Sequence, residues 1–171
     1  WAFEKAARGN PNGIAVLSSD SKYSYKELNN WANQIAHFFL AKGLQKGDVV
    51  AVMIENRAEL LATVIGLAKI GVISALLNTS QRSKVLIHSI NLVSPKFVVV
   101  GQEVEEAIAE IKSDIQVTNQ LLWIKDTGAE NMTAQPPEGF VDFLSLISSF
   151  PIFNPKTTSN IRAKDGLYYI Y

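Results

Sequence analysis

Val49–Ile54 (VVAVMI) is an unbroken apolar run of strand length, and a second such run follows at Val72–Leu77 (VISALL). A strand that is covered on both faces is apolar at every position, whereas a half-exposed strand alternates. Residues 56–70 have the pattern of one helix, and Gly71 stands where a helix stop is expected. The stretch 49–77 therefore predicts a β-α-β unit with two parallel, buried strands.

Short polar patterns mark where the predicted helices begin. Ser24 and Glu27 have the spacing of a capping box, in which each side chain accepts a hydrogen bond from the backbone N–H of the other residue. Asn56 and Glu59 have the same spacing, so Asn56 is interpreted as a helix cap rather than a ligand. Ser80 is placed to cap a third helix that runs to about residue 92.

The rest of the chain continues the alternation of strands and helices. We expect helices at 24–43, 104–111 and 140–147, a short hairpin at 14–24, strands at 97–100, 121–124 and from 167 onward, and irregular chain at 150–164. Repeated β-α-β units with short connections build a twisted parallel sheet. The sequence therefore predicts an α/β fold, with a mainly parallel twisted sheet, helices on both faces and the final strand inside the sheet.

One stretch resembles a membrane span. Leu60–Leu77 is apolar except for Thr63, Lys69 and Ser74. Lys69 lies near the middle of the stretch, where a charge costs roughly 2.5–3.5 kcal/mol on membrane-insertion scales. Gly66 and Gly71 suit a helix that ends and leads into a strand, and we therefore expect a helix–strand unit of a folded domain here.

The composition excludes several classes of function. Lysine and arginine total 16 and so do aspartate and glutamate, which argues against a basic surface for nucleic acid. The sequence has no cysteine, so it has no disulfide, thiolate nucleophile or cysteine–zinc site. His37 lies opposite the apolar stripe of its helix and is expected to be solvated, and His88 is expected on a helix surface. Neither histidine has a partner at metal-ligand spacing, so no metal site is predicted.

General nucleotide-binding and hydrolase motifs are missing from the sequence. Gly66 and Gly71 have the outer spacing of a P-loop, but Val72 and Ile73 stand where that loop needs lysine and Ser or Thr. No G-x-G-x-x-G follows a predicted strand, and no serine lies in a G-x-S-x-G elbow. Helix packing and a helix stop explain both glycines.

A series of local patterns in a fixed order carries a family resemblance. The patterns are Tyr23–Leu28 (YSYKEL), Gly43–Ala51 (GLQKGDVVA), Met53–Glu59 (MIENRAE), Gly66–Gly71 (GLAKIG) and Ala75–Arg82 (ALLNTSQR). Together they resemble the opening of the adenylate-forming superfamily, which includes acyl-CoA synthetases, luciferases and peptide-synthetase adenylation domains. Two of these segments, Glu55–Arg57 (ENR) and Ala75–Arg82 (ALLNTSQR), are most similar to the branch of fatty-acid transport proteins and very-long-chain acyl-CoA synthetases. The resemblance covers nearly the whole chain.

This resemblance implies a parent protein that is an ATP-dependent fatty acid–CoA ligase, with ATP, Mg²⁺, CoA and a fatty acid as cofactors and substrates. Residues 1–171 would then be a partial N-terminal domain that ends just before a Thr/Ser/Gly-rich phosphate loop. Tyr169 and Tyr171 would lie next to that loop, and this piece alone would supply no catalytic, cofactor-binding or metal-binding residue. It would be inactive by itself, and its location would be cytoplasmic or on a membrane surface.

Asn78, Thr79 and Arg82 are the substrate-channel candidates within the chain. They follow the carboxyl end of a predicted parallel strand, which is the edge where open α/β sheets bind ligands. An alternative hypothesis is an autonomous, non-catalytic α/β module that docks onto a protein or a membrane. Its apolar contacts would be Leu60–Leu77 and Phe150–Phe153 (FPIF).

Overall fold

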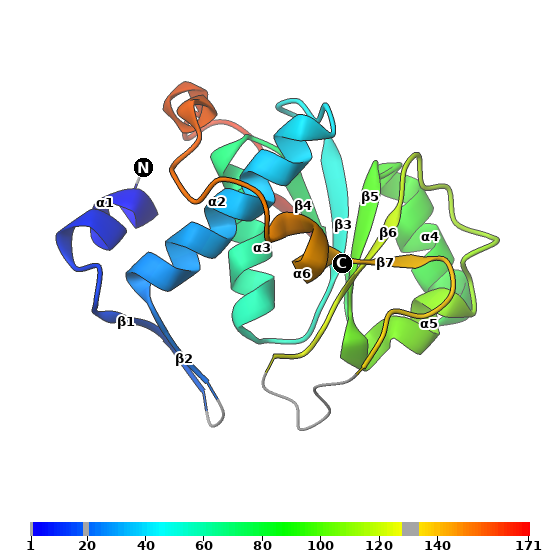
Figure 1. Cartoon of the computed structure of the whole chain (residues 1–171). Helices are drawn as coiled ribbons and strands as arrows, with labels where there is room; N and C mark the ends of the chain where they lie inside the picture. The colour runs from blue at the N-terminus through cyan, green and yellow to red at the C-terminus, as the bar shows by residue number, and fades with distance from the viewer. Residues whose placement is uncertain (1, 19–20, 128–133) are drawn as a thin grey trace.

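A computed structural model describes residues 2–18, 21–127 and 134–171 (Figure 1). Its main feature is a six-stranded sheet in the order β7-β6-β5-β3-β4-β8, and every neighbouring pair of strands is parallel. The strands are β3 (Val49–Met53), β4 (Ile73–Leu76), β5 (Phe97–Gly101), β6 (Leu121–Ile124), β7 (Phe140–Asp142) and β8 (Tyr168–Ile170). A separate antiparallel hairpin joins β1 (Ile14–Leu17) and β2 (Lys22–Ser24). The predicted α/β fold with a parallel sheet is confirmed.

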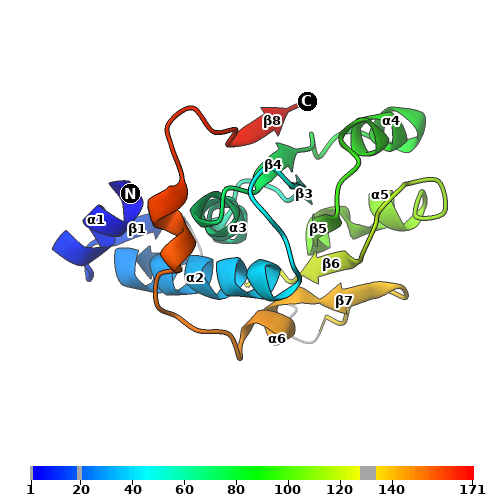
Figure 2. The ribbon, with the colours of Figure 1, turned by 90° about the horizontal axis from the view of Figure 1, so that it is seen from above.

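Helices cover both faces of the sheet (Figure 2). They are α1 (Ala2–Gly9), α2 (Tyr25–Ala41), α3 (Ala58–Lys69), α4 (Ser83–Val93), α5 (Glu105–Ala109) and α6 (Phe143–Ile147), with 3₁₀ turns η1 (Gln102–Val104) and η2 (Lys156–Asn160). Alternate residues of the strands serve the two faces. Val50 and Val52 pack in one core with α2, α3 and α6, while Ala51 and Met53 pack in the other with α4 and α5.

Helices α2 and α3 are in close contact, and this contact fixes the first core. Gly66 of α3 lies directly against α2, because a Cβ atom added there would be 2.8 Å from the backbone oxygen of Ala32. Helix α2 begins with the predicted capping box, in which the Ser24 hydroxyl accepts from the Glu27 N–H and the Glu27 carboxylate accepts from the Ser24 N–H. Gly43 follows the helix with a φ of 79°, as a helix stop requires.

The predicted membrane-like stretch is buried inside this fold. Leu60–Leu77 forms most of α3 and all of β4, and its side chains are buried or half-buried except that of Leu61, which is 44% exposed. Lys69 is fully buried, and its Nζ atom donates to Glu4 Oε1 at 2.8 Å, Asn29 Oδ1 at 2.9 Å and Asn154 Oδ1 at 3.0 Å. Burial lowers the pKa of Lys69, and the ion pair with Glu4 opposes that change without cancelling it. Within the described ranges, no helix has the length and hydropathy needed to cross a membrane.

Two predicted helix caps are wrong. Helix α3 begins at Ala58 with Arg57 as its extended cap residue, and Asn56 makes no cap bond. The Glu59 side chain is buried against Arg57 instead of folding back on the helix start. Helix α4 begins at Ser83, three residues after Ser80.

Several other elements differ from prediction. Residues 140–147 are not one helix: β7 comes first, and the Asp142 side chain then caps α6 by accepting from the Ser145 N–H. Helix α1 and the turn η2 were not predicted. His37 is half-buried rather than solvated, since its Nε2 atom lies 3.0 Å from the Phe153 carbonyl oxygen and the two rings pack edge to face. His88 is exposed on α4, as predicted.

The final strand pairs with β4 and forms the edge of the sheet. Ser74, Ala75 and Leu76 lie opposite Tyr168, Tyr169 and Ile170, respectively. The final strand is part of the sheet, as predicted, but it is an edge strand rather than an interior one, and its three residues are 44–73% exposed. Because the two strands are parallel, this pairing brings Tyr171 to the same carboxyl end of the sheet as the residue that follows β4.

The close α2–α3 contact gives a stability prediction. Gly66→Ala should lower the free energy of unfolding by about 1–3 kcal/mol, because overlap with a backbone oxygen outweighs the roughly 1 kcal/mol that alanine gains in a helix. Gly9→Ala in α1 is the matched control, because a Cβ atom added at Gly9 would have no heavy atom within 4 Å. Urea denaturation measures both variants. Equal or higher stability of Gly66→Ala would show that the two helices can separate without cost.

Candidate functional site

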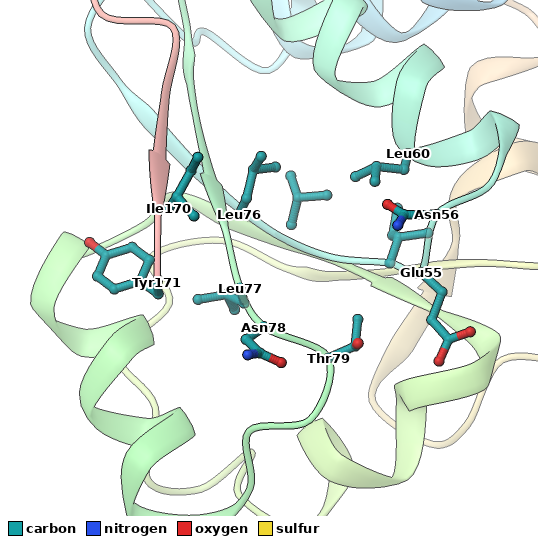
Figure 3. Close-up of a pocket in the computed structure, with 11 residues that line it drawn as sticks. Glu55, Asn56, Leu60, Leu76, Leu77, Asn78, Thr79, Ile170 and Tyr171 are labelled. Carbon is teal, nitrogen blue, oxygen red and sulfur yellow. The ribbon is translucent and has the colours of Figure 1, made fainter.

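A cleft of about 520 Å³ lies at the carboxyl ends of β3, β4 and β8 (Figure 3). Its walls come from the two loops that follow β3 and β4 and from the end of β8. The lining residues are Val52, Ile54, Glu55, Asn56, Leu60, Leu76, Leu77, Asn78, Thr79, Ile170 and Tyr171.

The path of the chain explains why a cleft forms at this edge. The connection after β3 passes to α3, which packs in the first core, and the connection after β4 passes to α4, which packs in the second core. Two neighbouring parallel strands whose connections leave toward opposite faces open a crevice beyond their carboxyl ends, and open α/β sheets bind ligands in such crevices. Figure 2 shows α3 and α4 on opposite sides of β4.

The cleft has an apolar floor and a polar rim. Val52, Leu60 and Leu76 belong to or pack against the first core. At the rim, Figure 3 shows Glu55 and Asn56 on the loop from β3, with Asn78 and Thr79 on the loop from β4. Amide, hydroxyl and carboxylate groups can orient a polar ligand through hydrogen bonds. The described lining residues include no histidine, lysine or arginine.

The structure brings three of the five residues singled out from sequence to this cleft. Asn78 and Thr79 line one wall, and Tyr171 lines the end of β8. Asn78 Oδ1 also accepts from the Ser80 N–H at 2.8 Å, which stabilises the turn after β4.

Arg82 and Tyr169 are not among the lining residues. The exposed Arg82 guanidinium donates to the backbone oxygens of Thr79 at 2.6 Å and Gln81 at 2.7 Å. It therefore braces the loop that carries Thr79 without lining the cleft. Tyr169 is 44% exposed at the sheet edge.

Glu55 and Asn56 line the cleft but were not predicted to do so. They follow the carboxyl end of β3 just as Asn78 and Thr79 follow that of β4. Polar residues that follow the carboxyl end of a parallel strand are candidates for a ligand site, and this reasoning, which selected Asn78, applies to Glu55 and Asn56 as well. Asn56 was instead interpreted as a helix cap because of its spacing from Glu59.

Arg57 ties the loop after β3 to its neighbours. Its guanidinium lies 3.0 Å from Glu59 Oε2 and 2.9 Å from Glu103 Oε2, and it donates to the backbone oxygens of Ile124 and Lys125, each at 3.1 Å. The Glu55 N–H donates to the other Glu103 oxygen at 2.6 Å. The loops after β3, β5 and β6 are thereby joined next to the cleft.

Two carboxylates near this edge are engaged in ion pairs within the chain. Among residues 2–18, 21–127 and 134–171, no group of three or more His, Asp and Glu side chains could hold a metal ion. Glu59, in the first turn of α3, and Glu103, in the loop after β5, are both paired with Arg57.

Tyr171 gives a spectroscopic test of the cleft. Burial raises the pKa of its phenol above the usual value of about 10, and the neighbouring Tyr169 adds to the increase. The folded chain thus keeps this proton at a pH where the unfolded chain loses it, and the associated stability is present below pH ~10 and lost as the pH rises through the folded pKa. The difference in absorbance at the tyrosinate band between the native chain and Tyr171→Phe should have its midpoint above pH ~10. A midpoint at or below that value would show that Tyr171 is solvated and does not lie in the cleft.

Comparisons with known proteins agree with this architecture. The chain is 29% identical over 171 residues to long-chain fatty acid transport protein 1 of Rattus norvegicus, covering 99% of the chain and 26% of that protein. It is also 29% identical over 170 residues to the medium/long-chain-fatty-acid–CoA ligase FadD6 of Mycobacterium tuberculosis, again covering 99% of the chain and 26% of the relative. The chain thus spans about a quarter of the length of these relatives.

A solved structure of a Mycobacterium tuberculosis fatty acyl CoA synthetase has the same fold. It superposes with a TM-score of 0.81 at 23% identity, over 100% of this chain and 32% of the other. The family model described as AMP-binding enzyme matches residues 3–171. The chain therefore belongs to the AMP-binding enzyme family.

Proposed function

We propose that residues 1–171 are the N-terminal part of a long- or very-long-chain fatty acid–CoA ligase. The observation that supports this most strongly is the family match, which runs from residue 3 to residue 171 and includes both walls of the cleft. The relatives named above are a fatty acid transport protein and a fatty-acid–CoA ligase, and the chain aligns with each along 99% of its own length.

The proposed reaction has two steps. A carboxylate oxygen of the fatty acid attacks the α-phosphorus of ATP, the bond to pyrophosphate breaks, and acyl-AMP forms. The sulfur of CoA then attacks the acyl carbon, the thiol loses its proton, and AMP leaves. Both steps depend on holding the reacting groups in line and on stabilising phosphoryl charge.

In this proposal, residues 1–171 act as a scaffold. Asn78 and Thr79 form part of the substrate channel, Tyr171 holds the strand next to a phosphate loop, and Arg82 braces the loop that carries Thr79. Tyr169 would be covered by neighbouring chain. The groups that bind ATP, Mg²⁺ and CoA are proposed to lie outside these residues, so the 171-residue piece should be inactive alone. The parent would act in the cytoplasm or at a membrane surface.

A non-catalytic docking module remains the second candidate. One observation favours it: the large apolar side chains of Ile152 and Phe153 are 54% and 64% exposed. Most side chains of Leu60–Leu77, the longer apolar stretch that this function would use, are buried or half-buried, and Leu61 is 44% exposed.

The test of the proposed ligase is acyl-CoA formation by the full-length protein that carries this chain. With ATP, Mg²⁺, CoA and a sixteen-carbon fatty acid, it should release AMP and acyl-CoA in equal amounts, and residues 1–171 alone should release neither. Asn78→Ala should lower kcat/KM about tenfold, which corresponds to one lost hydrogen bond of about 1.4 kcal/mol. Asn160→Ala, on the exposed turn η2, is the control and should stay within about twofold of wild type.

Each result of this assay has a defined meaning. Full-length protein that forms no acyl-CoA from any fatty acid tested would contradict the ligase proposal and favour the docking module. Equal loss in Asn78→Ala and Asn160→Ala would contradict the proposed role of Asn78 in the channel.

A further inference from the structure

Arg57 joins three loops at the carboxyl edge of the sheet, because it belongs to one of them and its guanidinium contacts the other two. It lies in the loop after β3, reaches Glu103 in the loop after β5, and donates to Ile124 and Lys125 at the end of β6. The side chain is only 14% exposed. In such an environment, charge-assisted hydrogen bonds are short and directional, so they fix the position of the groups they join.

Glu103 transmits this contact to the cleft. One of its oxygens accepts from Arg57 Nη2 at 2.9 Å, and the other accepts from the Glu55 N–H at 2.6 Å. The carboxylate folds over Gly101, where a Cβ atom would be only 2.2 Å from Glu103 Oε1. Only glycine leaves room for the carboxylate in this position. Glu55 and its neighbour Asn56 are lining residues, so the position of this wall depends on the Arg57–Glu103 pair.

Glu59 extends the same network in the opposite direction. Its carboxylate lies 3.0 Å from Arg57 Nη1 and accepts from the Thr127 N–H at 3.0 Å and the Thr127 hydroxyl at 2.5 Å. The Thr127 hydroxyl is 2.9 Å from the hydroxyl of Tyr23 on β2. The network therefore connects the first turn of α3 to the hairpin and to the end of β6.

We propose that Arg57 is a positioning residue, which sets the Glu55–Asn56 wall of the cleft by joining the loops after β3, β5 and β6. The effect on catalysis rests on the proposed ligase function, whereas the effect on the wall does not. Lysine cannot replace arginine in this role, because one ammonium group cannot form the planar set of four contacts that the guanidinium makes.

The chain offers a matched control at the other end of the same helix. Lys69, in the last turn of α3, is also a buried cation paired with a carboxylate, that of Glu4. It lies about 17 Å along the helix from the first turn, at 1.5 Å per residue. Lys69→Met removes a buried charge without touching the cleft, so it reports what loss of an ion pair does to stability alone.

Hydrogen exchange in the full-length protein tests the proposal directly. The Glu55 amide reports the Arg57–Glu103 contact, and the Leu77 amide, which donates to the Val52 oxygen at 2.9 Å, reports the stability of the sheet. In Arg57→Met, exchange at Glu55 should accelerate at least tenfold more than exchange at Leu77. Arg57→Lys should show the same change in smaller degree. Glu103→Ala, which removes the acceptor itself, sets the upper limit. In Lys69→Met, the ratio of the two rates should equal that of wild type.

Adenylate formation supplies the second measurement. Arg57→Lys should lower kcat/KM for acyl-AMP formation at least tenfold at a temperature where the protein is folded, while Lys69→Met should stay within twofold of wild type. If Glu55 and Leu77 accelerate equally in both Arg57 variants, or if kcat/KM is unchanged in Arg57→Lys, the positioning role is contradicted. If wild type forms no adenylate, the ligase proposal fails, and the exchange ratio alone then decides whether Arg57 positions the wall.

Discussion

The structure depends on one constraint, which is that the connections after β3 and β4 leave the sheet toward opposite faces. Helix α3 returns over the first core, and α4 returns over the second. Right-handed crossovers require this arrangement once β4 and β5 flank β3 on its two sides. No helix can then cover the carboxyl ends of both strands, and the polar residues that follow them face a common cleft. The location of the candidate site is therefore a consequence of strand order.

Helix α3 carries the other part of this architecture, because buried cations hold both of its ends. Arg57 stands before its first turn and Lys69 in its last turn. Removing water from a cation costs several kcal/mol, so each is tolerated only because carboxylates and oxygen acceptors surround it. Between the ends, Gly66 lets α3 approach the backbone of α2. Arg57 thus anchors the start of α3 next to the wall that begins at Glu55, whereas Lys69 anchors the far end of the helix, away from that wall.

Sequence was a sufficient guide wherever the structure is determined locally. The apolar runs at Val49 and Val72 predicted buried parallel strands, because a strand covered on both faces is apolar at every position. The spacing of Ser24 and Glu27 predicted a cap, because both residues of a capping box lie within one helical turn. Asn56 and Glu59 have the same spacing, yet Glu59 binds Arg57 and Thr127 instead. A contact between residues 68 positions apart outweighs a local cap, and a single sequence does not display it. Strand β7, at three residues, is too short to show a period of its own.

The same limit applies to the site. Asn78 and Thr79 could be assigned to this edge because they follow the end of a strand, and the family resemblance placed Tyr171 there. The partners of Arg57 come from the first turn of α3 and from the loops after β5 and β6, whose proximity only the fold reveals. In the proposed ligase, the crevice beyond β3, β4 and β8 receives the reacting groups. A structure of the full-length protein with a non-hydrolysable acyl-adenylate tests it most directly. We expect ligand atoms within about 4 Å of cleft residues from the loops after β3 and β4 or from the end of β8. An adenylate bound at the opposite edge of the sheet, with this cleft empty, would contradict it.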